Sequence, residues 1–334
     1  MVITQTPFRM SFFGGGSDFP EYFRENGGSV LSTTFDKYCY VTVRHLPRFF
    51  EYKTHLTYSA TEHVNDNSEI KHPAIREAMK MLDMHELRLT YDSDLPARSG
   101  LGTSSSFAVG MLNAFYALKG KYADKKKLAD EAICLEREKC DEAGGWQDQI
   151  AAAYGGFNRI DFSGDDYTVR PVIISPARKE ELCGNLMLFF TGFSRFSADI
   201  QNDTRKQVTQ KKADVGEMVK LVGDAERILT GKGALDAFGQ LLDYTWHLKR
   251  GLSKGISTDG IDAVYEKAKA AGATGGKLLG AGGGGFLLFY VEKEKQSAVM
   301  AALSGLLHVP FDFEDGGSKV IHYAPEFFTL ETGF

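Results

Sequence analysis

The chain has 334 residues, of which 43% are hydrophobic and 25% are charged, as in an ordinary globular protein. This composition excludes a disordered, collagenous or coiled-coil chain, and the length favours about two domains. The formal net charge is −5. Because affinity for nucleic acid depends on clustered Lys and Arg, we expect no nucleic-acid partner, although a local basic pocket for a small phosphate remains compatible with this charge.

The N-terminal residues and the cysteines predict a cytoplasmic protein. Pro7 and Arg9 interrupt residues 1–13, where a signal peptide needs an unbroken apolar stretch. No apolar run reaches the roughly 20 residues that span a bilayer, so we expect no membrane partner. Four cysteines without metal or redox spacing are too few for a disulfide scaffold and predict reduced, buried thiols. They are Cys39, Cys134, Cys140 and Cys183.

Hydrophobic periodicity predicts strands and helices in the first half of the chain. Residues 30–46 alternate weakly and are rich in Tyr, Thr and Val, and residues 87–91 alternate between apolar and polar, so both predict strands. Apolar residues at helical spacing predict a buried helix over 104–118. Two further helices are predicted over 125–139 and 146–154.

The second half is richer in predicted helix. Helices are expected over 198–230, 233–252 and 260–271, and buried strands over 186–190 and 286–291. The best domain boundary lies near Pro176, which gives domains of 1–175 and 176–334. Because both halves mix helix and strand without strict alternation, we expect an α+β fold rather than a doubly wound sheet.

Three stretches, over residues 7–18, 96–106 and 275–286, concentrate the glycines. The second stretch lies between a predicted strand and a predicted apolar helix. In it Gly100 and Gly102 precede four consecutive hydroxyl residues: Thr103, Ser104, Ser105 and Ser106. A glycine turn with a serine N-cap would be a purely structural interpretation. Exposed backbone N–H groups at a helix start, together with so many hydroxyls, favour a phosphate-binding loop.

The third stretch does not match the common nucleotide motifs. Gly276 and Lys277 are followed by Leu278, where a Walker A motif needs Ser or Thr. A dinucleotide-binding turn follows a strand and opens a helix, whereas this stretch precedes the predicted strand at 286–291. Taken alone, it indicates a tight turn.

In their order and spacing, the three stretches resemble the three motifs of the GHMP small-molecule kinases over essentially the whole chain. The resemblance implies a two-domain fold, with an S5-like α+β domain followed by a ferredoxin-like α+β domain. It also implies an ATP-dependent phosphotransferase with an alcohol acceptor. Within the family, residues 7–23 and 30–44 are most similar to kinases of D-glycero-D-manno-heptose 7-phosphate, which act on the anomeric hydroxyl of a sugar phosphate.

The resemblance also implies where ATP and Mg²⁺ bind. The expected ATP loop consists of Ser99, Gly100, Leu101, Gly102, Thr103, Ser104, Ser105 and Ser106. Mg²⁺ is expected at the Ser104 hydroxyl and the Glu136 carboxylate, which are hard oxygen ligands. Without the family, Glu136 is better interpreted as an exposed helix carboxylate near Arg137 and Lys139.

Two residues are expected to carry the transfer. Asp148 lies 12 residues after Glu136 and matches the family's catalytic aspartate, which accepts the proton of the acceptor hydroxyl. Arg9 matches the basic residue of the first motif and is expected beside Asp148, where it keeps the carboxylate ionised and offsets phosphoryl charge. The structural alternatives are an aspartate that stabilises a helix N-terminus and a surface arginine.

The acceptor site is expected at the first and third stretches. Its expected residues are Gly15, Gly16, Ser17, Asp18, Gly282 and Gly283. Asp18 matches a family position that hydrogen-bonds sugar hydroxyls. Galactokinases carry Glu and His where this chain has Gly15 and Gly16, which disfavours galactose and is compatible with a larger sugar. A sugar phosphate also needs basic residues, and at least two of four candidates should converge. These candidates are Arg24, Lys37, Arg44 and Arg195.

The leading interpretation is an ATP- and Mg²⁺-dependent kinase that converts D-glycero-D-manno-heptose 7-phosphate to the 1,7-bisphosphate. Alternatives are a kinase of an unphosphorylated sugar, such as fucose or a uronate, a catalytically silent sugar or nucleotide sensor on the same fold, and a nucleotide-binding structural protein. The joint presence of Asp148, Arg9, Ser104 and Glu136 argues against the sensor, which has no chemical need for a base. The intact sugar-side motif argues against the structural protein.

Overall fold

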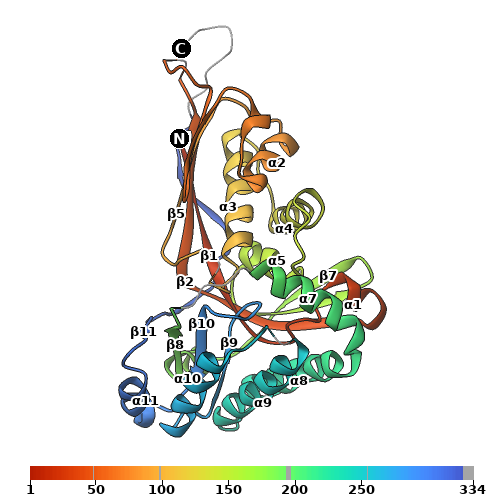
Figure 1. Ribbon diagram of the computed structural model, residues 1–334, viewed down its shortest axis with the longest axis vertical. Helices are drawn as coiled ribbons and strands as arrows, with labels where there is room; N and C mark the ends of the chain where they lie inside the picture. Colours follow the sequence, from red (N-terminus) through yellow and green to blue (C-terminus); the bar gives the residue numbers. More distant parts are fainter. Residues whose placement is uncertain (48, 98, 193–196, 254, 326–334) are drawn as a thin grey trace.

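The computed structural model describes residues 1–47, 49–97, 99–192, 197–253 and 255–325 (Figure 1). Its strands form two sheets. The larger sheet consists of β1 (Val2–Phe13), β2 (Gly28–His45), β3 (Thr54–Thr57), β4 (Thr61–Val64), β5 (Leu87–Ser93), β6 (Asn158–Ser163), β7 (Asp166–Pro171), β12 (Phe313–Glu314) and β13 (Lys319–Tyr323). The smaller sheet consists of β8 (Leu186–Phe190), β9 (Gly275–Leu278), β10 (Phe286–Tyr290) and β11 (Leu307–His308).

The larger sheet is built on the long antiparallel pair β1 and β2. Its main path runs β13-β1-β2-β5-β3-β4, while β6 and β12 pair with other parts of β2, and β7 pairs with β6. Strands β12 and β13 come from the end of the chain, so residues 313–323 return to the sheet that the first strands begin. The boundary near Pro176 stays a prediction, and this return shows that the larger sheet is not formed by residues 1–175 alone.

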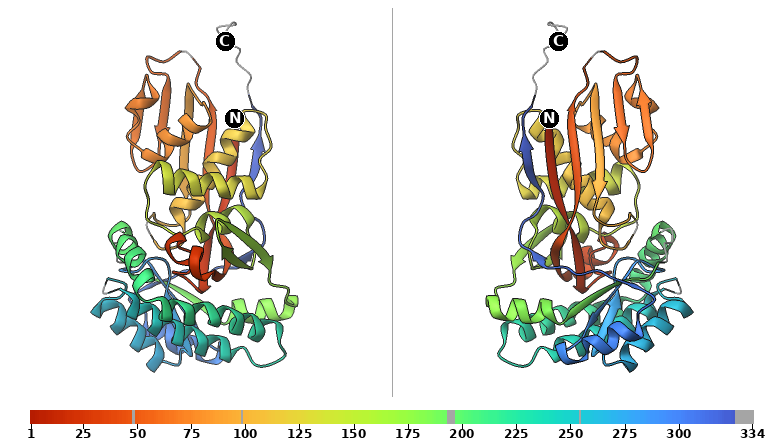
Figure 2. Two further views of the ribbon diagram at one scale, coloured as in Figure 1. Left: turned by 90° about the vertical axis from the view of Figure 1, so that its right-hand side faces the viewer. Right: turned by 90° about the vertical axis from the view of Figure 1, so that its left-hand side faces the viewer.

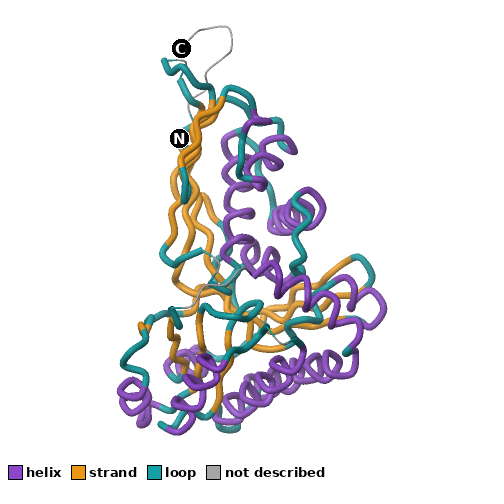
Figure 3. The backbone as a smooth tube through the Cα atoms, in the orientation of Figure 1, coloured by secondary structure: helices purple, strands orange, loops and turns teal. Residues whose placement is uncertain are grey.

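Helices cover one face of the larger sheet (Figures 1 and 3). They are α2 (Pro73–Met81), α3 (Thr103–Leu118), α4 (Lys125–Ile133) and α5 (Gln147–Tyr154), whereas α1 (Pro20–Asn26) lies beside β6. Helix α3 packs on β1 and β2 and is buried except at Ser104, because apolar residues occupy most of its circumference. The predicted helices at 104–118 and 146–154 are confirmed. The one predicted over 125–139 becomes a π-helical turn at Cys134–Lys139.

The remaining helices lie at the end of the molecule that holds the smaller sheet (Figure 2). They are α6 (Pro176–Gly184), α7 (Ser197–Gln210), α8 (Lys212–Thr230), α9 (Asp236–Leu252), α10 (Asp259–Ala270) and α11 (Gln296–Ala302). Helix α9 packs on β9 and β10 and reaches β1. The single helix predicted over 198–230 is wrong in one respect, because Lys211 has φ −104° and ψ 43°, outside the helical region, and separates α7 from α8.

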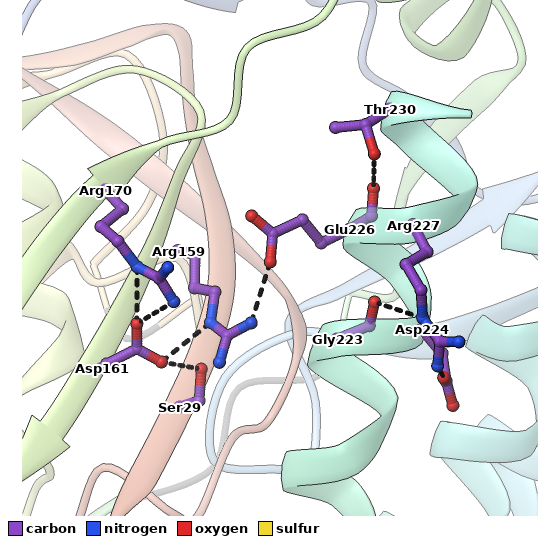
Figure 4. A network of polar contacts seen from close by, with 9 residues as sticks. All are labelled: Ser29, Arg159, Asp161, Arg170, Gly223, Asp224, Glu226, Arg227 and Thr230. Atoms are coloured by element: carbon purple, nitrogen blue, oxygen red, sulfur yellow. Dashed lines mark hydrogen bonds and ion pairs between the residues drawn. The ribbon is translucent and has the colours of Figure 1, made fainter. Parts of the chain in front are cut away.

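The two parts of the molecule share an apolar core and a polar network. The rings of Phe12 and Phe13 in β1 meet Phe238 in α9 edge-on, at centroid distances of 5.4 and 5.1 Å. Figure 4 shows the polar network, in which Arg159 of β6 donates to Glu226 of α8 at 2.8 Å. Asp161 accepts from Arg159 at 2.8 Å. The ring contacts hold α9 against β1, and the polar network holds α8 against β6.

Two expectations about the whole chain can be compared with the described residues. Mixed helices and sheets without strict alternation confirm the α+β prediction. The four cysteines are free thiols, as predicted, but only Cys39 is buried and the other three are partly exposed. In the described part of the chain, no helix is both long enough and apolar enough to cross a bilayer.

Candidate active site

The second and third glycine stretches pack against each other, backbone to backbone. A side-chain carbon added at Gly280 would lie 2.2 Å from the Cα atom of Gly100, and one added at Gly285 would lie 2.2 Å from the Ser99 carbonyl oxygen. Gly100 and Gly280 also have φ angles of +82° and +75°, where other residues are strained. Only glycine permits this contact, which we call the glycine seam (Gly100 against Gly280).

Arg9 and Asp148 form a bidentate ion pair beside the seam. Arg9 Nε donates to Asp148 Oδ1 and Arg9 Nη2 donates to Oδ2, both at 2.7 Å. Arg9 Nη1 also donates to the Gly100 carbonyl at 2.8 Å. The Arg9 side chain is 5% exposed and that of Asp148 is 22% exposed. The contact expected from the motifs is therefore present, and the carboxylate remains accessible from one side.

Gly102 also lies against this pair. A side-chain carbon placed there would lie 3.2 Å from Arg9 Cγ and 3.4 Å from Asp148 Oδ2. Gly102 has a φ of +72° and immediately precedes α3, so the helix begins directly at the ion pair. The N-terminus of α3 thus lies next to Arg9, and its helix dipole makes the arrangement suited to a phosphate.

Glu136 lies beneath the hydroxyl residues of this loop. Its carboxylate accepts hydrogen bonds from Ser104 Oγ at 2.8 Å, from Ser105 Oγ at 2.7 Å and from the Gln149 amide. Burial, and then the nearby Glu142 carboxylate, raise the pKa of Glu136 to about 7 against the effect of these hydrogen bonds. The buried, hydrogen-bonded carboxylate replaces the exposed helix residue that spacing alone would indicate.

The structure separates the hydroxyl residues of the loop by role. Ser104 is exposed, whereas Ser105 and Ser106 are buried. Ser106 Oγ donates to the Pro7 carbonyl at 2.9 Å and ties α3 to β1. Ser99 Oγ is buried and has no hydrogen-bond partner among the described residues. Leu101 and Thr103 are also buried, so Ser104 offers the accessible hydroxyl.

A hard-cation site at Ser104 and Glu136 is consistent with this geometry. The exposed hydroxyl and the buried carboxylate form an oxygen pair at the start of α3, and phosphate oxygens and water would supply the remaining ligands that Mg²⁺ requires. Within the described ranges, no group of three or more His, Cys, Asp and Glu side chains offers a site made by the protein alone. The residues therefore fit a metal that arrives with a phosphate.

Asp18 connects the first stretch to the start of α5. It is 2% exposed, Oδ1 accepts from the Gly16 N–H at 2.9 Å, and its carbonyl accepts from the Trp146 N–H at 3.0 Å. A side-chain carbon at Gly145 would lie 1.9 Å from Asp18 Oδ2, which explains the glycine there. Burial, and then nearby Asp148, raise the pKa of Asp18.

The other expected substrate residues lie in two places. Ser17 Oγ donates to the Gly14 carbonyl at 2.8 Å and closes the turn of the first stretch. Gly15 leaves room for a side-chain carbon at ordinary contact distance, 3.9 Å from Gln147 Nε2 and Ser11 Oγ. Gly282 and Gly283 instead pack on Ile256, whose carbonyl accepts from the Gly283 N–H at 3.0 Å.

The expectation that the named basic residues converge is wrong for the three that the structure describes. Arg24 pairs with Asp165 at 2.8 Å, and Lys37 pairs with Asp36 at 2.8 Å. Arg44 lies opposite Arg88 in the β2–β5 ladder. Each sits on a different part of the larger sheet or on α1. Arg195, the fourth candidate, lies outside the described residues.

A different pair of arginines does converge near the first stretch. Arg137 and Arg205 both contact Glu21 Oε1, at 2.8 and 2.6 Å. Arg137 Nη1 also donates to the Gly144 carbonyl at 2.6 Å. Gly144 and Gly145 are consecutive, so Arg137 binds the peptide unit that faces Asp18. The sequence alone marks Arg137 only as a neighbour of Glu136, because the convergence depends on the packing of α7 on α1.

Two lysines near the seam were also not expected as site residues. Lys249 Nζ in α9 donates to the Leu278 carbonyl at 3.1 Å and to the Gly280 carbonyl. Lys277 Nζ in β9 is buried and donates to the Phe12 carbonyl at 2.6 Å. Burial, and then Arg9, lower the pKa of Lys249 to about 7, while Asp18 and Asp148 act in the opposite direction.

Comparisons with known proteins identify the family of the chain. Residues 69–156 match the GHMP kinases N terminal domain, and residues 226–308 match the GHMP kinases C terminal domain. Over 321 residues the chain is 30% identical to a D-glycero-alpha-D-manno-heptose 7-phosphate kinase of Campylobacter jejuni, covering 90% of this chain and 93% of the relative.

Two solved structures share the fold. A putative sugar kinase from Campylobacter jejuni is 28% identical, with a TM-score of 0.71 over 96% of this chain and 97% of that one. A D-glycero-D-manno-heptose 1-phosphate kinase from Bacteroides thetaiotaomicron is 24% identical, with a TM-score of 0.79 over 98% and 100%. The chain therefore belongs to the GHMP kinases, ATP-dependent phosphotransferases that act on hydroxyl groups.

Proposed function

We propose that the protein transfers the γ-phosphoryl group of ATP to the anomeric hydroxyl of D-glycero-D-manno-heptose 7-phosphate, giving the 1,7-bisphosphate. The observation that carries this proposal is the Arg9–Asp148 pair, held beside Gly102 at the start of α3. The Campylobacter jejuni relative, named a heptose 7-phosphate kinase, supports the acceptor. The Bacteroides thetaiotaomicron structure is named a heptose 1-phosphate kinase, so the position of the acceptor hydroxyl must be measured.

The ATP phosphates are assigned to the loop of residues 99–106 at the N-terminus of α3. Its backbone N–H groups and the helix dipole favour negative charge, and Ser104 is exposed there. Ser104 and Glu136 are assigned to Mg²⁺, which when bound neutralises charge on the phosphate oxygens. Gln149 and Ser105 orient the Glu136 carboxylate toward Ser104 through their own hydrogen bonds.

Asp148 is assigned as the base. Both of its oxygens accept from Arg9, but each carboxylate oxygen has a second lone pair that can accept from the sugar hydroxyl. The bond from the hydroxyl oxygen to the γ-phosphorus forms while the bond from that phosphorus to the ADP oxygen breaks, and the hydroxyl proton passes to Asp148. Arg9 remains protonated throughout and offsets the developing charge.

The acceptor is assigned to the backbone of Gly15 and Gly16, where no side chain intervenes, with Asp18 meeting ring hydroxyls through its remaining lone pairs. A distal phosphate on the sugar would meet Arg137 and Arg205, whose two charges exceed that of Glu21 by one. Arg137 binds the Gly144 carbonyl, which belongs to the peptide unit facing Asp18. A ring held at Asp18 therefore places a substituent near both arginines.

The test is a kinetic comparison of sugars and their 7-phosphates with the purified enzyme. We expect kcat/KM to fall by about 30-fold or more when the acceptor lacks its phosphate, because losing one partner of a charge pair costs about 2–5 kcal/mol. Arg205→Met should remove most of that difference. Arg178→Met is the control, since Arg178 binds carbonyls of α8 and the following turn, away from Asp18.

Equal kcat/KM for the phosphorylated and free sugars would contradict the sugar-phosphate acceptor and favour a kinase of a free sugar. It would leave the family assignment unchanged. The site of transfer follows from the product, because an anomeric phosphate blocks the reducing end of the sugar whereas a phosphate elsewhere does not. A product that still reduces would contradict transfer to the anomeric hydroxyl.

A further inference from the structure

Lys249 and Lys277 place two amino groups at the glycine seam without a carboxylate partner among the described residues. Lys249 Nζ donates only to the Leu278 and Gly280 carbonyls among the described contacts, and Lys277 Nζ only to the Phe12 carbonyl. Other cations of this region are neutralised, since Lys269 pairs with Asp243 and Arg250 pairs with Asp262. A poorly solvated cation without an anion is costly, so a ligand that supplies one would be bound strongly.

Lys249 lies where three parts of the site meet. Its partner Gly280 packs on Gly100, and the Gly100 carbonyl accepts from Arg9 at 2.8 Å. One turn further along α9, Leu252 lies 3.8 Å from the position of a side-chain carbon on Gly16. The ammonium is therefore placed between the acceptor side of the site at Gly16 and the phosphate side at Gly100.

The two lysines differ in accessibility. Lys277 is 2% exposed and is enclosed by β9 and the end of β1, so it is fixed in place. Lys249 is only partly buried. Its two acceptors are backbone carbonyls, and water can take the place of the amino group at each of them. Lys249 can therefore turn toward a ligand, whereas the enclosed Lys277 cannot.

We propose that Lys249 is a further catalytic residue, whose ammonium binds the γ-phosphoryl group of ATP on the side opposite Arg9. The group in transfer would then lie between one cation from β1 and one from α9, so each half of the molecule contributes a charge. The ammonium forms no covalent bond and keeps its proton, exchanging two carbonyl acceptors for phosphoryl oxygens. This assignment depends on the proposed function only in taking ATP as the donor.

The test measures nucleotide affinity without any acceptor. We expect Lys249→Met to weaken binding of the Mg²⁺ complex of a non-hydrolysable ATP analogue by about 10–100-fold, the range for hydrogen bonds to charged groups, while ADP affinity changes little. Lys249→Arg should recover most of the loss and part of kcat. Lys211→Met is the matched control. Like Lys249, Lys211 donates from Nζ to a backbone carbonyl, but its acceptor is Gly251 in α9, away from the seam.

Equal losses for ADP and for the ATP analogue, or no loss for either, would overturn the proposal. A defect that appears only in KM for the phosphorylated sugar would also overturn it, because the ammonium would then bind the phosphate of the acceptor. Thermal melting of each variant separates misfolding from a binding defect, and Lys249→Arg provides a second variant if Lys249→Met fails to fold. Failure of the heptose assay would not affect these nucleotide measurements.

Discussion

The two sides of the seam carry their charges differently. On the side of β1, Arg9 is matched by Asp148 in a bidentate pair before any ligand binds. On the side of α9, Lys249 and Lys277 have only carbonyl partners among the described residues. The first arrangement is preorganised, so its geometry does not depend on substrate. The second arrangement lacks an anion until a ligand binds, so the interaction of the lysines with that ligand contributes to its binding free energy.

The largest expected effect tests the preorganised side. Asp148→Asn should lower kcat by about 10²–10⁴-fold, the range for a lost general base, and leave nucleotide affinity nearly unchanged. Asparagine keeps one oxygen acceptor for Arg9 but removes the basic charge. Steady-state kinetics together with nucleotide titration of the same variant check this. A kcat near that of the wild type would show that the pair is structural and that positioning alone drives transfer.

A smaller effect is expected from Gly102→Ala, which moves the pair without removing it. The added carbon meets Arg9 Cγ and Asp148 Oδ2, and φ is +72°, so we expect a loss of about 1–2 kcal/mol in the free energy of unfolding and a lower kcat.

Gly120→Ala is the control for Gly102→Ala. Gly120 has a similar φ of +66° with nothing within 4 Å of the added carbon. It should lose comparable stability and keep its kcat, as denaturant unfolding and kinetics can measure. If both variants lose kcat equally, the geometry of the Arg9–Asp148 pair is not critical.

The smallest effect concerns the protonation of Lys249, on the α9 side of the seam. Burial lowers the pKa of Lys249 to about 7, so at pH 8 most of the ligand-free protein carries a neutral amine there. A phosphoryl group favours the ammonium, so binding of the ATP analogue should take up a proton, by up to about one per site. Calorimetry in buffers with different ionisation enthalpies measures this uptake.

Lys249→Met should abolish that proton uptake. The charged groups that act on Lys249 are Arg9, Asp18, Asp148 and Lys277. Uptake that persists in the variant would assign the proton to another group. The same pKa has a consequence for stability, because between pH 7 and 10.5 the unfolded chain holds the proton and the folded chain does not. The contribution of Lys249 to the free energy of unfolding should therefore rise with pH across that window.

The sequence predicted the Arg9–Asp148 side of the seam better than the Lys249–Lys277 side, for a physical reason. Arg9, Asp148, Ser104 and Glu136 lie in short contiguous segments that match the motifs of the family, and their expected contacts are present in the structure. Lys249 has no local pattern, since its surroundings arise only when α9 packs on β9.

The other differences between the predictions and the structure also depend on tertiary packing. No Gly or Pro in the sequence marks the end of α7 at Lys211. The convergence of Arg137 and Arg205 on Glu21 brings together three separate segments of the chain. The roles of the site residues remain proposals, whereas the backbone framework of α3 and of the strand at β2 follows closely from periodicity.

The return of β13 to β1 has a consequence for how the molecule is made. β1 leaves the ribosome long before its partner, because Val2 pairs with Tyr323, 321 residues further along the chain. Until then, the outer edge of β1 presents unpaired backbone groups, which invite intermolecular strand pairing. Contacts of such long sequence separation also form slowly. The nascent chain should therefore depend on rapid completion or on a chaperone that shields β1.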